Sequence, residues 1–331
     1  MTPPRASPAQ SRRRWPGCAR LAAVASCALP LALPAQIRNE DDQLRFRASD
    51  LEVTIRFRDN RAKPLGDQIR DVVSGGLAHY TRIFGGAPRA GDGTPAVRLT
   101  INVAIDRLGG GETEPGVISL LVARDPVLGF YDWKLALLHE TLHLWNTASF
   151  RHAGPAEQWF AEGTAEFYAA QAAARIGVLD QLSALRAAGT VVQAYAAGAQ
   201  GAPSLTQAGV PAEVGGGRGE GRRAVNHAGW TAALVLDRSI RERTGNEKSL
   251  DDLMRWLFSN YSRAEGPYAT LDLVRGVRDA TGEDVMEFFA RHVLGRLPLP
   301  LAETPGLAEL LSGETVSDAL VLHSIGVRPA G

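Results

Sequence analysis

The motif His139-Glu140-Thr141-Leu142-His143 is followed, a short distance along the chain, by Trp159-Phe160-Ala161-Glu162-Gly163. If residues 133–149 form a helix, the two imidazoles lie about 40° apart on one face and roughly 5–6 Å apart along the axis. Two nitrogens so placed can bind one Zn²⁺ and leave room for a third protein ligand and a water molecule. Glu140 is then aimed to take a proton from that water. The motif therefore predicts a metal site rather than a solvated helix face with two ordinary histidines.

Two further features of this stretch support a metal site. Eighteen residues, 144–161, separate His143 from Glu162, which lies in an apolar segment that also predicts a helix. A carboxylate buried in such a segment is costly unless a cation neutralises it. The first segment itself predicts an amphipathic helix, with apolar members that include Leu135, Leu138, Leu142 and Trp145.

The H-E-x-x-H motif, the spacing of eighteen residues and the Glu of W-x-x-E-G resemble the gluzincin metallopeptidases, whose metal ligands are two His and one Glu. The spacing matches the aminopeptidase N family. The residues around the motif, such as His143-Leu144-Trp145-Asn146, resemble the glycyl aminopeptidase family. This resemblance covers residues 131–300. It implies one Zn²⁺ held by His139, His143 and Glu162, with Glu140 as general base.

Glu166 follows Glu162 by one helical turn. Gluzincins often carry an acidic residue at this place, so the resemblance implies that Glu166 accepts the free ring N–H of a ligand histidine and orients it. An ordinary solvated glutamate on a helix is the alternative.

Both related families place a tyrosine hydroxyl near the metal, about sixty-four residues after the ligand Glu, where it stabilises the oxyanion. This sequence has Asn226 at that place and His227 beside it. His227 could act as an imidazolium and Asn226 as a weaker donor, whereas packing at the start of a helix is the alternative for His227. Tyr168 and Tyr195 could also reach the site.

The segment 109–112 lies where relatives carry a glycine-containing substrate-binding motif, which assigns Gly111 and Glu112 to substrate binding by resemblance. Glu112 would bind the amino terminus of a peptide, although a flexible solvent loop is the favoured interpretation of this segment. The predicted strand Val117–Ala123 follows, close to where gluzincins bind an extended substrate at a sheet edge.

Residues 1–35 have the composition of a secretory signal peptide. Arg12, Arg13 and Arg14 precede an apolar run from Leu21 to Leu33, and Ala35 ends a small-residue cleavage site. The run is too short, and too interrupted by proline, to span a bilayer. We therefore expect export to the periplasm or the medium, with a weak twin-arginine signal.

Both cysteines, Cys18 and Cys27, lie in this presequence. A lipid anchor at Cys27 is possible but not favoured, because an apolar run follows where a polar tether is usual. The processed chain would have no thiolate ligands and no disulfides, which leaves His and carboxylates for any metal. The chain has 36 basic and 36 acidic residues, and residues 1–35 hold five Arg and no acid, so the remainder is acidic and predicts no nucleic-acid partner.

We divide the rest into an N-terminal α/β part of the catalytic domain at 36–130, a zinc-binding helical part at 131–300 and a C-terminal tail at 301–331. The patterns predict strands at 45–58, 95–106 and 117–123, and a helix at 64–84. Residues 197–224, rich in Gly and Ala, are expected to be the least structured region and to form a lid or cleft edge. We expect the α+β class, and the resemblance implies a thermolysin-like fold with zinc in a cleft between two lobes.

The sequence thus predicts an exported zinc peptidase that acts on peptides or proteins, with aminopeptidase activity slightly favoured over endopeptidase activity. The alternative is a non-catalytic protein that keeps zinc for stability or binds peptides without cutting them. The missing tyrosine favours this alternative, whereas Glu140 counts against it, because a purely structural site has no use for a general base.

Overall fold

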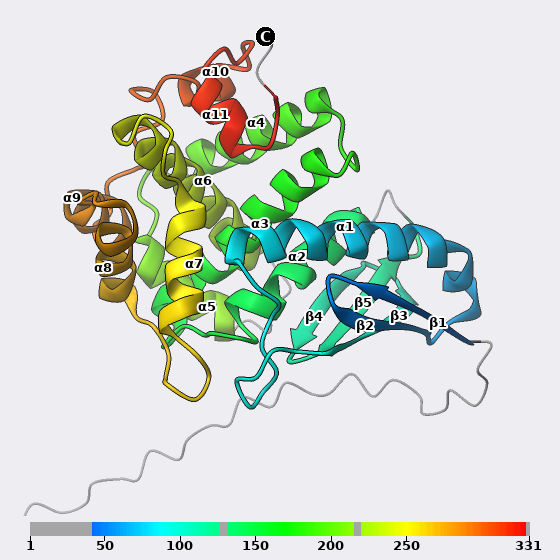
Figure 1. The fold of residues 1–331 in the computed structure, drawn as a ribbon. Helices are drawn as coiled ribbons and strands as arrows, with labels where there is room; N and C mark the ends of the chain where they lie inside the picture. The colour runs from blue at the N-terminus through cyan, green and yellow to red at the C-terminus, as the bar shows by residue number, and fades with distance from the viewer. Residues whose placement is uncertain (1–41, 126–131, 215–219, 329–331) are drawn as a thin grey trace, which may run out of the picture. The chain divides into compact units, whose positions relative to one another are not determined.

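A computed structural model describes residues 42–125, 132–214 and 220–328 (Figure 1). Its sheet has five strands in the order β1-β2-β3-β5-β4. The three central strands, β2, β3 and β5, run parallel, and both edge strands are antiparallel to their neighbours. The strands are β1 (Gln43–Ala48), β2 (Leu51–Phe57), β3 (Arg98–Asp106), β4 (Gly110–Glu114) and β5 (Val117–Ala123). With the helices below, this arrangement confirms the predicted α+β class.

The predicted single strand at 45–58 is wrong, because the chain turns back at Ser49 and Asp50. Both residues have positive φ, 45° and 67°, and Ala48 pairs with Leu51 across the turn. Two positive φ values are typical of a two-residue turn whose twist matches a hairpin. The inward residues change from even positions, such as Leu44, to odd positions, such as Val53, and this change of parity marks the turn in the sequence.

Residues 110–112 belong to strand β4, so the interpretation of the segment 109–112 as a flexible loop is wrong. β4 pairs with β5 along its length and forms the edge of the sheet, so Val117–Ala123 lies inside the sheet. β4 also contacts the helix that carries the H-E-x-x-H motif. The edge strand next to this helix is therefore β4.

Helices cover one face of the sheet (Figure 1). A 3-10 turn, η2 (Asn60–Leu65), leads into α1 (Gly66–Phe84), which ends at Gly85 with a φ of 75°. This confirms the predicted helix at 64–84. The inward strand residues, such as Ile55, Ile101 and Leu120, are fully buried beneath these helices.

α2 (Trp133–Asn146) and α3 (Gln158–Arg175) are core helices. Every residue of α2 from Ala136 to Asn146 is buried, so the prediction of an amphipathic helix is wrong. The strands β4 and β5 contact α2 on one side, and α1 and α3 contact it elsewhere, which leaves little of it facing water. The candidate ligands are therefore held between packed elements and not on a surface.

Residues 197–224 are largely helical where the structure describes them, so the predicted unstructured lid is wrong for this part. They include the end of α4 (Gln181–Gly198), the whole of α5 (Leu205–Val214) and the start of α6 (Glu220–Arg243). α5 packs on η3 (Pro155–Glu157), and a Cβ on Gly209 would lie 1.9 Å from the carbonyl oxygen of Pro155. Glycine here permits close packing of backbones.

The remaining helices follow α6 in short succession. Ser249 caps α7 and Asp252 closes the capping box, as predicted. Residues 301–328 contain two short helices with buried apolar residues, which contact α4 and α6, although we divide this segment off as a tail. The helices are α7 (Leu250–Asn260), α8 (Thr270–Thr281), α9 (Met286–Phe288), the π-helical η4 (Phe289–Val293), α10 (Leu307–Ser312) and α11 (Ala319–Ser324).

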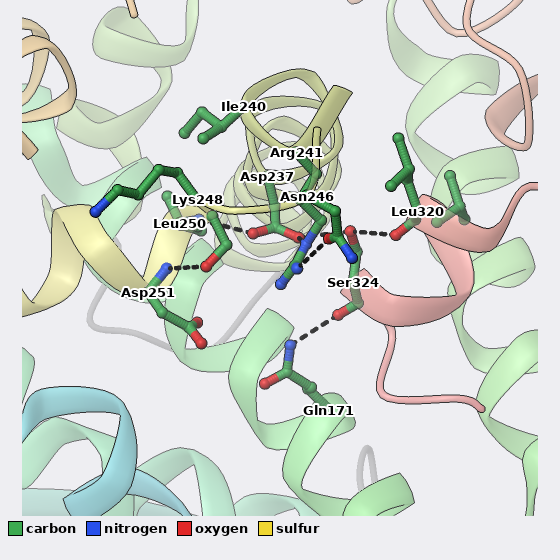
Figure 2. A network of polar contacts seen from close by, with 12 residues as sticks. Gln171, Asp237, Ile240, Arg241, Asn246, Lys248, Leu250, Asp251, Leu320 and Ser324 are labelled. Carbon is green, nitrogen blue, oxygen red and sulfur yellow. Dashed lines mark hydrogen bonds and ion pairs between the residues drawn. The ribbon is translucent and has the colours of Figure 1, made fainter. Parts of the chain in front are cut away.

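A buried polar network around Asp237 of α6 connects α11 with α3, α6 and the start of α7 (Figure 2). The Asp237 carboxylate accepts hydrogen bonds from the Leu250 N–H at 2.7 Å, the Ser324 hydroxyl at 2.5 Å and the Arg241 Nε at 2.7 Å. Gln171 of α3 donates to the carbonyl of Ser324 at 2.9 Å. The network therefore fixes α3 and α6, the two helices that carry several candidate site residues.

None of the helices in the described parts of the chain has both the length and the apolar character needed to cross a membrane. The predicted signal peptide, its cleavage site after Ala35 and both cysteines lie outside the described residues. The domain boundaries at 130 and 300 remain predictions.

Candidate metal centre

His139, His143 and Glu162 each offer a ligand atom, and these atoms all lie within 4.8 Å of one another. α2 supplies both histidines four residues apart, and the first part of α3 supplies the glutamate. The two Nε2 atoms lie 2.9 Å apart, and Glu162 Oε2 lies 3.4 Å from that of His139 and 3.8 Å from that of His143. All three side chains are at least nine-tenths buried.

These distances fit a tetrahedral zinc ion. Ligand atoms about 2.0–2.1 Å from such an ion lie about 3.3–3.4 Å from one another. The observed separations of 2.9, 3.4 and 3.8 Å bracket that value. Small adjustments would therefore bring all three atoms to one ion.

The hydrogen bonds of Asn146 determine which nitrogen of His143 is free to bind a metal. Asn146 Nδ2 donates to the carbonyl of Ala161 at 2.8 Å, which fixes the orientation of the amide. Its Oδ1, 2.7 Å from His143 Nδ1, must then accept a proton from that nitrogen. His143 Nε2 consequently carries a lone pair, and it points at the other candidate ligands.

His139 has a comparable outer partner. Its Nδ1 lies 3.5 Å from Glu166 Oε1, and Asn226 of α6 donates to the same oxygen at 3.0 Å. Glu166 is 8% exposed, so it is not a solvated helix glutamate. With Nδ1 turned to a carboxylate, His139 Nε2 faces the His143 Nε2 and Glu162 as a further electron-pair donor. Three electron-pair donors this close together are stable only with a cation, either a proton or a metal ion, between them.

The charges of the site also favour a cation. Burial alone lowers the pKa of His139, but the carboxylates of Glu166, Glu162 and Glu140 raise it to about 9. Glu140, Glu162 and Glu166 are each 7% or 8% exposed, so solvent screens their charge only weakly. Their combined negative potential stabilises a proton or a metal ion between them.

Glu140 lies against strand β4. The Thr113 hydroxyl is 2.7 Å from Glu140 Oε2 and 2.8 Å from the Glu140 carbonyl oxygen. A Cβ on Gly111 would lie 2.4 Å from Glu140 Cγ, so this position must be glycine at the present separation. Successive side chains of a strand point to opposite faces, so Glu112 points away from Glu140 and is exposed.

The structure therefore brings together some of the residues that the sequence singles out. His139, Glu140, His143, Glu162 and Glu166 lie together, and Asn226 joins them through Glu166. Gly111 packs on Glu140, whereas Glu112 lies on the other face of β4. His227 lies beside Asn226 and is half-buried. Both residues are inside α6, which begins at Glu220, so the prediction of a helix start near Asn226 is wrong.

Neither tyrosine considered for the oxyanion reaches this group. The Tyr168 hydroxyl donates to Asp251 at 2.8 Å, and the Tyr195 hydroxyl accepts the Leu299 N–H at 2.9 Å. Both hydroxyls are engaged by other helices and loops.

The helices α3 and α6 cross in direct backbone contact beside the site. A Cβ on Gly163 would lie 2.2 Å from the carbonyl carbon of Gly229, and one on Gly229 would lie 2.1 Å from the carbonyl oxygen of Trp159. The two helices can lie this close together only with glycine at both positions 163 and 229. The crossing places Asn226, three residues before Gly229, within reach of Glu166.

Two residues of the site were not singled out for a role from the sequence, Asn146 and Thr113. Asn146 follows His143 by three residues in a predicted helix, so the spacing alone could have placed it on the same face. Thr113 is brought to Glu140 by the pairing of β4 with β5, and local sequence carries no comparable signal for it.

We expect Asn146→Ala to weaken zinc binding by about 10–100-fold, because loss of a partner that orients a ligand histidine has this typical cost. Competition with a chromogenic chelator measures the affinity. Asn260→Ala is the control, since Asn260 Nδ2 also donates to a helix carbonyl, that of Trp256, but at the surface. Equal affinity of the Asn146 variant and the wild type would contradict the orientation of His143 described above.

A scan of the sequence against protein-family models finds no match, and a search of curated proteins finds none either. Solved structures do match. An aminopeptidase N family protein from Idiomarina loihiensis superposes with a TM-score of 0.64 and 16% identity over 81% of this chain. An M1 zinc metallopeptidase from Deinococcus radiodurans gives 0.51 and 16% over 78%. A mutant of a two-domain M1 zinc metallopeptidase, bound to L-tryptophan, gives 0.51 and 17% over 79%.

This chain spans about half the length of these structures, 48%, 52% and 52% respectively. Identities this low relate the folds and do not assign an activity. The chain therefore has the fold of the M1 zinc metallopeptidases, and its His139–His143–Glu162 group is consistent with the ligand set of an H-E-x-x-H gluzincin.

Proposed function

We propose that this chain is a zinc-dependent peptidase. The observation that carries the proposal is the convergence of two imidazole nitrogens and one carboxylate within 4.8 Å, next to the carboxylate of Glu140. The shared fold with zinc metallopeptidases supports it. A purely structural metal site would not need Glu140, a further carboxylate beside the three proposed ligands.

Each residue has a defined part in the proposed reaction. His139 Nε2, His143 Nε2 and a Glu162 carboxylate oxygen hold the ion, and Asn146 and Glu166 orient the two imidazoles. Bound there, Zn²⁺ would polarise the scissile carbonyl and acidify a water molecule. Glu140 takes the proton of the attacking water at a carboxylate oxygen and returns it to the leaving amine nitrogen.

The candidates for the oxyanion donor are two neighbouring residues of α6, Asn226 and His227. Asn226 donates one amide N–H to Glu166, and this hydrogen bond supports a role for Asn226 in orienting Glu166. His227 and the second N–H of Asn226 stay as candidates for the oxyanion. A peptidase without the tyrosine hydroxyl is expected to be slow, because one such donor is worth about 10²–10³ in rate.

We propose peptides or proteins as substrates, with aminopeptidase activity slightly favoured over endopeptidase activity. The resemblance and the aminopeptidase N family name of one structural neighbour support this preference. Glu112 is proposed to bind the peptide amino terminus, although its side chain lies on the face of β4 away from Glu140. Paired assays on peptides with free and acetylated amino termini test the preference, which equal rates would contradict.

We also propose export, with a signal peptide at 1–35 cleaved after Ala35 and no lipid on Cys27. The presequence composition supports this proposal. N-terminal sequencing of the protein recovered from the periplasm or medium tests it, and an intact presequence on the exported protein would contradict it.

A non-catalytic, zinc-stabilised or peptide-binding protein is the second candidate. Asn226 at the place of the expected tyrosine, and the engagement of Tyr168 and Tyr195 elsewhere, favour it. Retention of Glu140 within this group favours the peptidase.

Digestion of a broad peptide library with mass-spectrometric detection separates the two. We expect cleavage by the zinc-loaded protein, loss of cleavage after chelation, and recovery when Zn²⁺ is added back. A folded protein that contains zinc and cleaves no member of the library would overturn the peptidase proposal in favour of the second candidate.

A further inference from the structure

Strand β4 holds the side chain of Glu140 at two points. The Thr113 hydroxyl lies 2.7 Å from Glu140 Oε2, and the Gly111 backbone packs on the Cγ, Cδ and Oε1 atoms. A methyl group on Gly111 would come within 2.4–2.8 Å of these three atoms. Glu140 is 7% exposed, so little space remains for another side-chain conformation.

The hydroxyl of Thr113 has one proton and two acceptors within reach. The Glu140 carbonyl oxygen, at 2.8 Å, lies inside α2, where carbonyls accept the N–H four residues on. The carboxylate carries a charge, and hydrogen bonds to charged acceptors are shorter and roughly twice as strong as neutral ones. The Thr113 hydroxyl therefore donates its hydrogen bond to Glu140 Oε2.

We propose that Thr113 is a positioning residue for the general base. This inference rests on the proposed peptidase function. With Oε2 held by Thr113, rotation of the carboxylate is blocked, and Oε1 is the oxygen that takes the proton from the attacking water. The same Oε1–H bond then breaks as the leaving amine nitrogen gains the proton, so Glu140 ends as the carboxylate that it was at the start.

Gly111 and Thr113 act together because they lie two residues apart on one face of the strand. Glycine lets the strand approach closely enough for the threonine hydroxyl to reach the carboxylate. A misplaced base loses rate without losing substrate affinity, because correct geometry is needed for the proton transfer and not for binding.

The test compares Thr113→Val, which keeps the shape but removes the hydroxyl, with Thr113→Ser, which keeps the hydroxyl. The substrate is a peptide identified in the library digest. We expect Thr113→Val to lower kcat about 10-fold with KM unchanged, and the kcat of Thr113→Ser to stay within about twofold of wild type. Thr100→Val is the matched control, since Thr100 is half-buried on the opposite face of the sheet. Zinc content and Tm are measured for all variants, and we expect both to equal wild type.

Crystal structures of the zinc-loaded variants supply a readout other than activity. We expect the Glu140 carboxyl to change conformation in Thr113→Val and to keep it in Thr113→Ser. Gly111→Ala provides a second route, because it displaces the same carboxyl while keeping the hydroxyl, and it is expected to lower kcat as well.

The outcomes separate the inference from the function on which it rests. If wild type cleaves peptides and Thr113→Val has the kcat of Thr100→Val, the inference is overturned and the peptidase stands. If Ser is impaired as much as Val, the hydroxyl is not the cause and the inference is overturned. If wild type cleaves nothing, the peptidase proposal fails and the inference fails with it.

Discussion

Replacing Glu140 by Gln is expected to lower kcat by about 10³-fold or more while zinc stays bound, because general acid–base catalysis contributes typically 10²–10⁴-fold. The amide of Gln has nearly the same shape and can still accept the hydrogen bond of Thr113 through its oxygen. It cannot take a proton from water at neutral pH. The three ligand atoms belong to other residues, so zinc should stay bound and Tm should change little, although the lost charge of Glu140 removes part of the negative potential at the ion.

The measurement is the rate of cleavage of one library-derived peptide, with zinc content determined by mass spectrometry. Glu114→Gln is the matched control, since Glu114 is exposed and lies on β4 facing away from Glu140. Substantial cleavage by Glu140→Gln would assign the proton transfer to another group. Loss of zinc in this variant would instead place Glu140 among the ligands.

Gly163→Ala is expected to have the largest effect on stability. Its methyl group would lie 2.2 Å from the Gly229 carbonyl carbon and 2.4 Å from the Gly229 Cα, and backbone atoms cannot turn aside as a flexible side chain can. Overpacking in a core typically costs about 1–3 kcal/mol, and a clash with backbone lies at the upper end or beyond it. We expect a loss of about 3 kcal/mol in the free energy of unfolding, measured by urea denaturation.

The consequences of this change extend to the metal site, because Gly163 adjoins Glu162. Forcing α3 and α6 apart would separate Asn226 from Glu166, so zinc affinity is expected to fall with stability. Gly229→Ala tests the same contact from the other helix, and the double variant is expected to be less than additive.

Gly189→Ala is the control, since Gly189 lies within α4 and its nearest atom would be at 3.6 Å, an ordinary contact. Ala is favoured over Gly inside a helix by roughly 0.5–1 kcal/mol, so this variant should be neutral or stabilised. A Gly163→Ala variant as stable as the Gly189 variant would show that the two helices can separate at little cost.

Much of the metal site follows from local sequence. The helical spacing of His139 and His143 requires nothing beyond the helix itself, because residues four apart share a face in any α-helix. Glu162 is predicted as the third ligand from its distance to the motif and from its apolar neighbours, because an unpaired carboxylate is costly in an apolar segment. The placement of these three residues within 4.8 Å agrees with both arguments.

Other features of the sequence were misleading because the same pattern suits two structures. Alternation of apolar and polar residues on both sides of Ser49 and Asp50 suggests a single strand, although the change of parity at the turn separates β1 from β2. The glycines of the 109–112 segment suggested a flexible loop, and those of 197–224 a lid. Glycine equally allows backbones to touch, as Gly111 does at Glu140 and Gly209 at Pro155.

What the sequence alone determined is thus the local part of this protein: the pair of imidazoles on one helix, the glutamate on the next, and the α+β class. Tertiary structure decided which groups surround them. Thr113 reaches Glu140 only because β4 pairs with β5 at the sheet edge, and Asn226 reaches Glu166 only because two glycines let α3 and α6 touch. Such contacts join residues 27 and 60 positions apart, and no local periodicity records a distance of that kind.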